Sequence, residues 1–196
     1  MRHRVLALVM FVPLLLSACA SSDAVGTSGS SDLAVTERVD AIGAAVEAWG
    51  DAATLPQAKA SAEAALNLVV GPDGPGYGDS DGDGVIQGEA DEGLLPGRLG
   101  EAGLAQSEPI SACVGADVLG GSWEDPAARW ATAQDVYDAW TPSNNTMPSL
   151  PSHPQRIVGW ATLTLATDSL DEAHEYAGHA KIHVDVSRAA IDACSS

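Results

Sequence analysis

Basic side chains are scarce in this chain. Its 196 residues include nine Lys or Arg against 27 Asp or Glu, and the formal net charge is −18. A surface this acidic repels phosphate backbones and anionic lipid headgroups, which argues against nucleic-acid binding and against electrostatic docking on a membrane. Cations are the ligands that such a surface favours.

Cysteine is scarcer still, and long apolar runs are missing. The three cysteines, Cys19, Cys113 and Cys194, form no Cys-x-x-Cys pair, so their spacing gives no sign of a zinc or haem site. The apolar run over residues 5–16 is shorter than the roughly 20 residues that a membrane-spanning helix needs. The sequence also has no nucleophile elbow, phosphate loop or dinucleotide fingerprint.

The first nineteen residues have the layout of a secretory signal. Arg2 and Arg4 precede the apolar run, and small residues follow it. Residues 16–19, Leu-Ser-Ala-Cys, resemble the lipobox of bacterial lipoproteins, which implies cleavage before Cys19 and diacylation of that residue. We therefore expect an extracytoplasmic cell-envelope protein, anchored to a membrane through lipid on Cys19. Which membrane it is, and whether there is a protein partner, are left open.

Cleavage leaves seven basic side chains against 27 acidic ones, a net charge near −20. Residues 20–32 are rich in Ser, Gly and Asp and are predicted to be a flexible tether. Residues 33–196 are enough for one domain with a core. In an oxidising compartment, Cys113 and Cys194 are expected to form a disulfide. Closing a loop of about 80 residues contributes on the order of 4 kcal/mol in the loop-entropy model.

Apolar residues recur every three or four positions over most of this domain, which predicts helices. One stripe precedes Gly50 and another precedes Gly71. Their members are Val35, Val39, Ile42, Val46 and Trp49, and then Ala58, Ala62, Ala65, Leu66 and Val69. A third helix is predicted to begin near Ser122, with Trp130, Ala133, Tyr137 and Trp140 on its inner face.

A fourth helix is predicted to begin at Ser152, and residues 162–165 alternate as a short strand would. The last helix, from Ser169 to about Cys194, has apolar residues on two sides, which favours packing between two neighbours. The predicted fold class is all-α, a four- or five-helix bundle. A long Gly- and Asp-rich loop insertion, residues 71–97, separates the second helix from the third.

This insertion contains a run of closely spaced aspartates. Residues 79–87, with sequence DSDGDGVIQ, carry carboxylates at alternate positions, followed by glycine and two apolar residues. Calcium takes six to eight oxygen ligands, and three crowded carboxylates repel one another without a cation. The segment resembles the EF-hand loop. The resemblance implies Asp79, Asp81 and Asp83 as side-chain ligands, Gly84 as the turn, Val85 as the carbonyl donor and Ile86 as a hydrophobic pin.

The resemblance ends before the twelfth position, where an EF-hand places a bidentate acid and this chain has Ala90. We therefore expect Glu89, Asp91 or Glu92 to close the loop. Loss of the ideal bidentate acid predicts weak binding, with a dissociation constant of about 10⁻⁴–10⁻³ M. The competing interpretation is a solvated acidic turn, because Asp and Gly are also common turn residues.

The last predicted helix is rich in histidine. Residues 174–179, His-Glu-Tyr-Ala-Gly-His, resemble the HExxGH zinc motif of dipeptidyl peptidase III enzymes, which implies His174 and His179 as ligands and Glu175 as the acid/base. The further acidic motif of those enzymes is missing downstream. Five residues on a helix also separate the two histidines by about 140°. We therefore expect no peptidase activity, and a metallohydrolase is only a remote alternative.

Glu175, His179 and His183 form a better stripe, because they recur every four residues. They are the alternative metal site, for zinc or copper. The simpler interpretation is a polar seam of histidines bonded to neighbouring helices. Together these patterns predict a non-enzymatic, calcium-binding envelope lipoprotein in which calcium is structural. A transition-metal-binding protein is the alternative.

Overall fold

The computed structural model describes residues 28–194, with side chains described from residue 33. The predicted signal, the predicted lipidation site Cys19 and most of the predicted tether lie outside the described residues. The elements are α1 (Ser28–Gly50), α2 (Leu55–Val70), the 3₁₀ helix η1 (Leu104–Gln106), α3 (Ile110–Cys113), α4 (Pro126–Asp138), the 3₁₀ helix η2 (Met147–Ser149), α5 (His153–Ala166) and α6 (Leu170–Cys194). Helices are the only regular elements of this part of the chain, in agreement with the all-α prediction.

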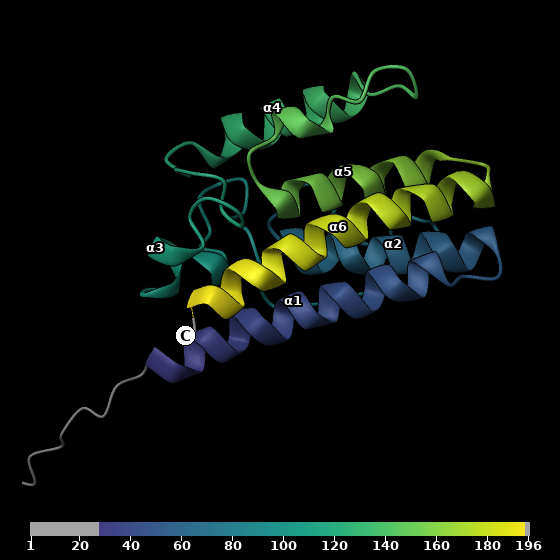
Figure 1. Cartoon of the computed structure of the whole chain (residues 1–196). Coiled ribbons are helices and arrows are strands. Elements are labelled where there is room, and N and C mark those ends of the chain that lie inside the picture. The colour runs from purple at the N-terminus through teal and green to yellow at the C-terminus, as the bar shows by residue number, and fades with distance from the viewer. Residues whose placement is uncertain (1–27, 195–196) are drawn as a thin grey trace, which may run out of the picture.

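Four long helices make up the body of the molecule (Figure 1). α1 packs against α2 and α6, and α5 packs against the same two helices from the opposite side. α4 lies outside this group against α5. The short helix α3 contacts α6 near its C-terminal end.

The two predicted apolar stripes of α1 and α2 are buried. All five residues of the first stripe and all five of the second are at most 2% exposed. Because a helix repeats every 3.6 residues, a spacing of three and four places such residues on one face. The core therefore lies where the sequence predicts it, between α1, α2, α5 and α6.

Polar side chains define the starts of two helices. The Thr54 hydroxyl accepts a hydrogen bond from the Gln57 amide group (3.4 Å), and the Ser152 hydroxyl accepts one from Gln155 (3.3 Å). Each satisfies an amide group that the first turn of a helix leaves without a partner. The Ser152 cap therefore sets the start of α5 at His153.

The predicted strand at residues 162–165 is wrong, because α5 continues to Ala166. The Thr162 hydroxyl donates to the carbonyl of Val158, one turn earlier, at 2.8 Å. A helix accommodates a threonine in this way. Ile157, Val158 and Trp160 are at most 2% exposed, so burial stabilises the helix across the alternating segment.

α6 buries one of its two apolar sides. Ala173, Ala177, Val184 and Ile191 are buried, whereas Ile182 on the other side is 57% exposed. The prediction that α6 packs between two neighbours is confirmed, because α6 contacts both α1 and α5. The second apolar side, which suggested this packing, is nevertheless exposed at Ile182.

The long connection after α2 is fastened to the bundle. Leu94 and Leu95 donate backbone hydrogen bonds to Leu68 and Val69 at 3.2 and 3.0 Å, and both leucine side chains are buried. Further on, Cys113 of α3 and Cys194 of α6 are joined as predicted, with sulfur atoms 2.06 Å apart. None of the helices in residues 28–194 combines the length and apolar content that crossing a bilayer requires.

Candidate metal centre

Two polar residues of α2 are completely buried, and they hold the loop that follows. Glu63 and Asn67 are four residues apart, so they lie on the same face of the helix, and both are 0% exposed. A buried carboxylate is stable only when it is hydrogen-bonded or paired. Both side chains therefore require partners from the adjacent loop.

Backbone groups of the loop supply these partners. One carboxylate oxygen of Glu63 accepts hydrogen bonds from the amide groups of Ser80 (2.6 Å) and Asp81 (2.9 Å), and the other accepts one from Gln87 (2.7 Å). Asn67 accepts from the Gly78 amide at 3.0 Å and donates to the Gly78 and Gln87 carbonyls at 3.1 and 2.7 Å. The loop is therefore attached to α2 on both sides of its aspartates.

The three aspartates fold the loop around their own carboxylates. Asp79 accepts hydrogen bonds from the amide groups of Gly82 and Gly84, both at 2.9 Å. Asp81 accepts one from Asp83 at 2.9 Å, and Asp83 accepts one from Val85 at 2.8 Å. These are the short-range bonds by which Asp stabilises tight turns.

The backbone conformation at the turn favours glycine. Gly84 has φ of +90°, whereas nothing lies within 4 Å of a Cβ atom built there. Side chains with a Cβ rarely adopt this conformation. The backbone angle, and not lack of space, therefore favours glycine at this position.

The loop and α2 together gather carboxylates that could hold a cation. Ligand oxygens of Glu63, Asp79 and Asp81 lie within 4.8 Å of one another. Two oxygens that bind one Ca²⁺ at 2.3–2.6 Å are at most about 5 Å apart, so this spacing fits a shared ion. In residues 33–194 this is the one group of three or more His, Cys, Asp or Glu with such spacing.

The pKa of Asp81 is raised by burial and by this crowding of carboxylates. Burial raises the pKa of the Asp81 carboxyl, and the neighbouring charges of Glu63, Asp83 and Asp79 raise it further, against the lowering effect of the hydrogen bond from Asp83. A cation among these oxygens would reverse the repulsion.

Only part of the predicted ligand set belongs to this group. Asp79 and Asp81 are members of the group. Asp83 is not, and its carboxylate accepts a hydrogen bond from the Val85 amide group. Val85 is 54% exposed. Ile86 is 42% exposed, so its prediction as a hydrophobic pin is wrong, because the backbone of the next residue attaches this end of the loop to α2.

The three acids expected to close the loop are not in the group. Glu89 and Asp91 line a separate surface hollow with Tyr77, and the backbone carbonyl of Glu92 accepts a hydrogen bond from Arg38. The acid that the structure places beside the aspartates is Glu63, which the sequence analysis missed. Its signal was a glutamate within the apolar stripe of α2, one turn before a buried asparagine.

The histidine stripe of α6 contacts separate partners. Glu175 is 70% exposed, and its carboxylate is 3.9 Å from His179. The His179 ring stacks on Trp160, with centroids 4.4 Å apart. His183 lies 3.0 Å from His153 instead. Glu175, His179 and His183 therefore do not form one ligand cluster in the described structure.

The motif that resembles the peptidase site is divided in the same way. His174 Nε2 lies 2.9 Å from the carbonyl oxygen of Ala52, beyond the end of α1, whereas His179 faces Trp160 on α5. The two histidines of the motif therefore contact different parts of the bundle and do not face a common site.

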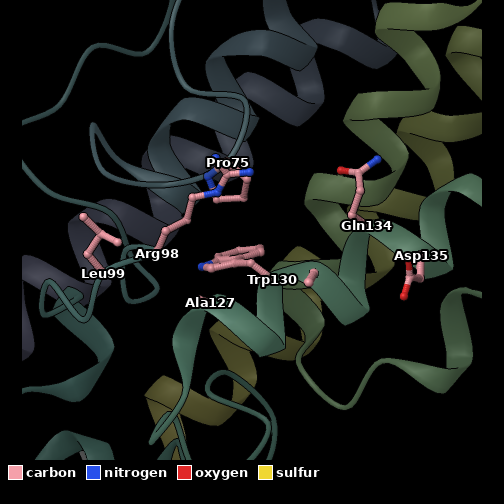
Figure 2. Close-up of a pocket in the computed structure, with 8 residues that line it drawn as sticks. Pro75, Arg98, Leu99, Ala127, Trp130, Gln134 and Asp135 are labelled. Carbon is pink, nitrogen blue, oxygen red and sulfur yellow. The ribbon is translucent and has the colours of Figure 1, made fainter.

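A surface hollow of about 490 Å³ lies between the long connection and α4. Figure 2 shows the Trp130 ring between Pro75 and Arg98 on one side and Gln134 on the other. The Trp130 Nε1–H donates to the carbonyl of Pro96 at 2.9 Å, which fixes the ring. A neighbouring hollow shares Trp130 and extends to Ser80, so the loop that carries the three aspartates borders this surface.

Comparison with known proteins finds no matching family model, no similar curated protein and no similar solved structure. The fold and the site by themselves define a helical-bundle protein with a partly buried acidic cluster that could hold a metal ion.

Proposed function

We propose that this chain is a lipid-anchored cell-envelope protein whose helical domain binds calcium and catalyses no reaction. The domain is a four-helix bundle of α1, α2, α5 and α6, and the insertion 71–97 is its calcium-binding segment. The observation that carries the proposal is the proximity of the Glu63, Asp79 and Asp81 carboxylates. It places a buried acid of α2 beside two aspartates of the EF-hand-like segment.

Free lone pairs in the cluster suit a hard cation. An ionised carboxylate has about four lone-pair sites, and backbone amide groups occupy three on Glu63, two on Asp79 and one on Asp81. Glu63 can therefore supply at most one oxygen, and the aspartates must supply the others. Asp83, the Val85 carbonyl and water complete the six to eight oxygens that calcium takes.

Calcium in this position has a structural role. The ion joins the insertion to α2, and an ion that binds only the folded state stabilises that state by mass action. At ten to one hundred times the dissociation constant, the free energy of unfolding rises by about 1.4–2.7 kcal/mol. The same loop borders the hollow beside Trp130, so an ordered loop also maintains that surface for a protein partner.

The test is a calcium titration of the purified full chain in detergent, followed by terbium luminescence and by calorimetry. We expect one ion per chain with a dissociation constant of about 10⁻⁴–10⁻³ M. Calcium should also raise the melting temperature by roughly 3–10 °C, whereas zinc should not. No binding at millimolar calcium, or equal binding by an Asp81→Ala/Asp83→Ala variant, would refute the proposal.

A further inference from the structure

Two histidines from different helices meet away from the calcium loop. His153 begins α5, and His183 lies in the middle of α6, which runs beside α5 (Figure 1). Their Nδ1 atoms are 3.0 Å apart, and their ring planes are inclined by 57°. Both residues are partly exposed to solvent.

The contact requires one shared proton. Two imidazole nitrogens at this distance are hydrogen-bonded only when one carries a hydrogen and the other presents its lone pair. A second hydrogen at the contact would face the first, so one Nδ1 of the pair must present an unprotonated lone pair. An unprotonated nitrogen is the form in which imidazole binds a metal.

The surroundings keep both rings neutral at pH 7. Burial lowers the pKa of His183 to about 4, with help from His153, Arg156 and His179. Burial and Arg156 also lower the pKa of His153, against the opposing effect of Asp117. Arg156 itself donates to the carbonyl of Leu150 at 2.8 Å, so one of its guanidinium nitrogens points to the loop before α5.

We propose that His153 and His183 bind a transition-metal ion that prefers right-angled ligands, Cu²⁺ or Ni²⁺, through their Nδ1 atoms. With metal–nitrogen bonds of about 2.0–2.1 Å, a 3.0 Å separation corresponds to a ligand–metal–ligand angle of about 91–97°. A tetrahedral zinc ion would need the two nitrogens about 3.3–3.4 Å apart. A tetragonal ion therefore requires less movement of the two rings than zinc does.

Binding needs no net release of a proton. The hydrogen on the donating Nδ1 transfers to Nε2 of the same ring through solvent, and both Nδ1 lone pairs then face the ion. Among residues 33–194 no third His, Cys, Asp or Glu completes this pair at metal-ligand spacing, so water fills the remaining positions. The site is thus open and exchangeable, and it is independent of the proposed calcium site on α2.

The experiment is a Cu²⁺ titration of the calcium-loaded full chain in detergent, in competition with a chelator of known affinity. His3 lies before the proposed cleavage site at Cys19, so the mature lipidated chain lacks it. The variants are His153→Gln and His183→Gln. The matched controls are His174→Gln and His179→Gln, which remove the other two histidines of the described structure.

We expect one tight Cu²⁺ per chain, and an affinity at least about tenfold lower in either pair variant. Both controls should bind as the wild type does. Electron paramagnetic resonance of the wild type should show coupling to two imidazole nitrogens, a readout that does not depend on the folding of any variant. Coupling to fewer than two, or unchanged affinity in His153→Gln, would overturn the proposal. So would losses confined to His179→Gln and His183→Gln, which would assign the ion to the α6 stripe.

Discussion

The side chain of Glu63 and the backbone of Asp81 are joined by a 2.9 Å hydrogen bond, although their two carboxylates lie in the same acidic cluster. The bond positions Asp81, and the proximity of like charges destabilises the cluster without a cation. Glu63 is therefore both the anchor of the loop and a candidate ligand. Variants of α2 can separate these two roles.

Replacing Glu63 by Gln should remove the calcium response. Glutamine has one accepting oxygen and places an NH₂ group among amide donors, so we expect at least about tenfold weaker calcium binding. The free energy of unfolding should also fall by about 1–3 kcal/mol. Calorimetry and melting with and without calcium measure both effects.

Asn67→Ala is the matched control, because it removes three hydrogen bonds to the loop but no carboxylate. It should lower the melting temperature without calcium and keep part of the calcium-induced rise. A Glu89→Gln/Asp91→Asn/Glu92→Gln variant tests the acids that the sequence favours. Loss of binding in that variant, with normal binding in Glu63→Gln, would mean that Glu63 is only an anchor.

Gly84→Ala should weaken calcium binding. A side chain at φ of +90° costs about 1–2 kcal/mol, which corresponds to roughly a 5- to 30-fold loss of affinity. Gly178 in α6 also has nothing within 4 Å of a Cβ atom built on it, but its backbone is helical. Gly178→Ala should therefore raise the free energy of unfolding by about 0.5–1 kcal/mol and leave calcium binding unchanged. Equal effects of the two substitutions on calcium affinity would contradict the assigned role of Gly84.

The disulfide between Cys113 and Cys194 should stabilise the domain through its long loop. The two residues are 81 positions apart, and we expect Cys113→Ala/Cys194→Ala to lower the free energy of unfolding by about 2–4 kcal/mol. Chemical denaturation measures the change. A reductant should destabilise the wild type to a similar degree and leave the variant unaffected; a variant as stable as the wild type would show that the link is dispensable.

Stability should fall in mild acid because of the histidine pair. The pKa of His183 is about 4 in the folded chain, below its ordinary value of 6.5, so the unfolded chain binds more protons between these pH values. The stabilisation is complete above pH 6.5 and is lost as the pH falls toward 4. The shift corresponds to at most about 3–4 kcal/mol, which partial solvent exposure reduces to roughly 1–2 kcal/mol.

This pH dependence is measured by denaturation at pH 7, 5.5 and 4 with a metal chelator present. A His153→Gln/His183→Gln variant should lose less stability than the wild type over this range, and the difference isolates the pair from the many carboxylates. Parallel curves for the two proteins would contradict the assignment.

Cys19 should carry the membrane anchor. The lipobox resemblance implies that mass spectrometry of the membrane fraction will find a mature chain that begins at a lipidated Cys19. Cys19→Ala should accumulate with residues 1–18 still attached and without lipid. An unmodified mature chain beginning elsewhere would refute the anchor.

Local patterns in the sequence account for much of this protein. The stripe from Val35 to Trp49 predicts a buried helical face because helical spacing is a property of neighbouring residues, and that face is buried. The aspartates at 79, 81 and 83 indicate a tight acidic turn for the same reason, since each bonds to amide groups a few residues away.

The tertiary structure determined which residues that are distant in the sequence come into contact. Glu63 is 18 residues before Asp81, and it joins the loop only because packing turns that face of α2 toward it. His183 meets His153, 30 residues earlier, rather than the histidine on its own stripe. Apolar residues on two sides of α6 likewise could not show that Ile182 stays exposed. Spacing along the chain determines the faces of each helix, and only the packing of whole helices determines what each face contacts.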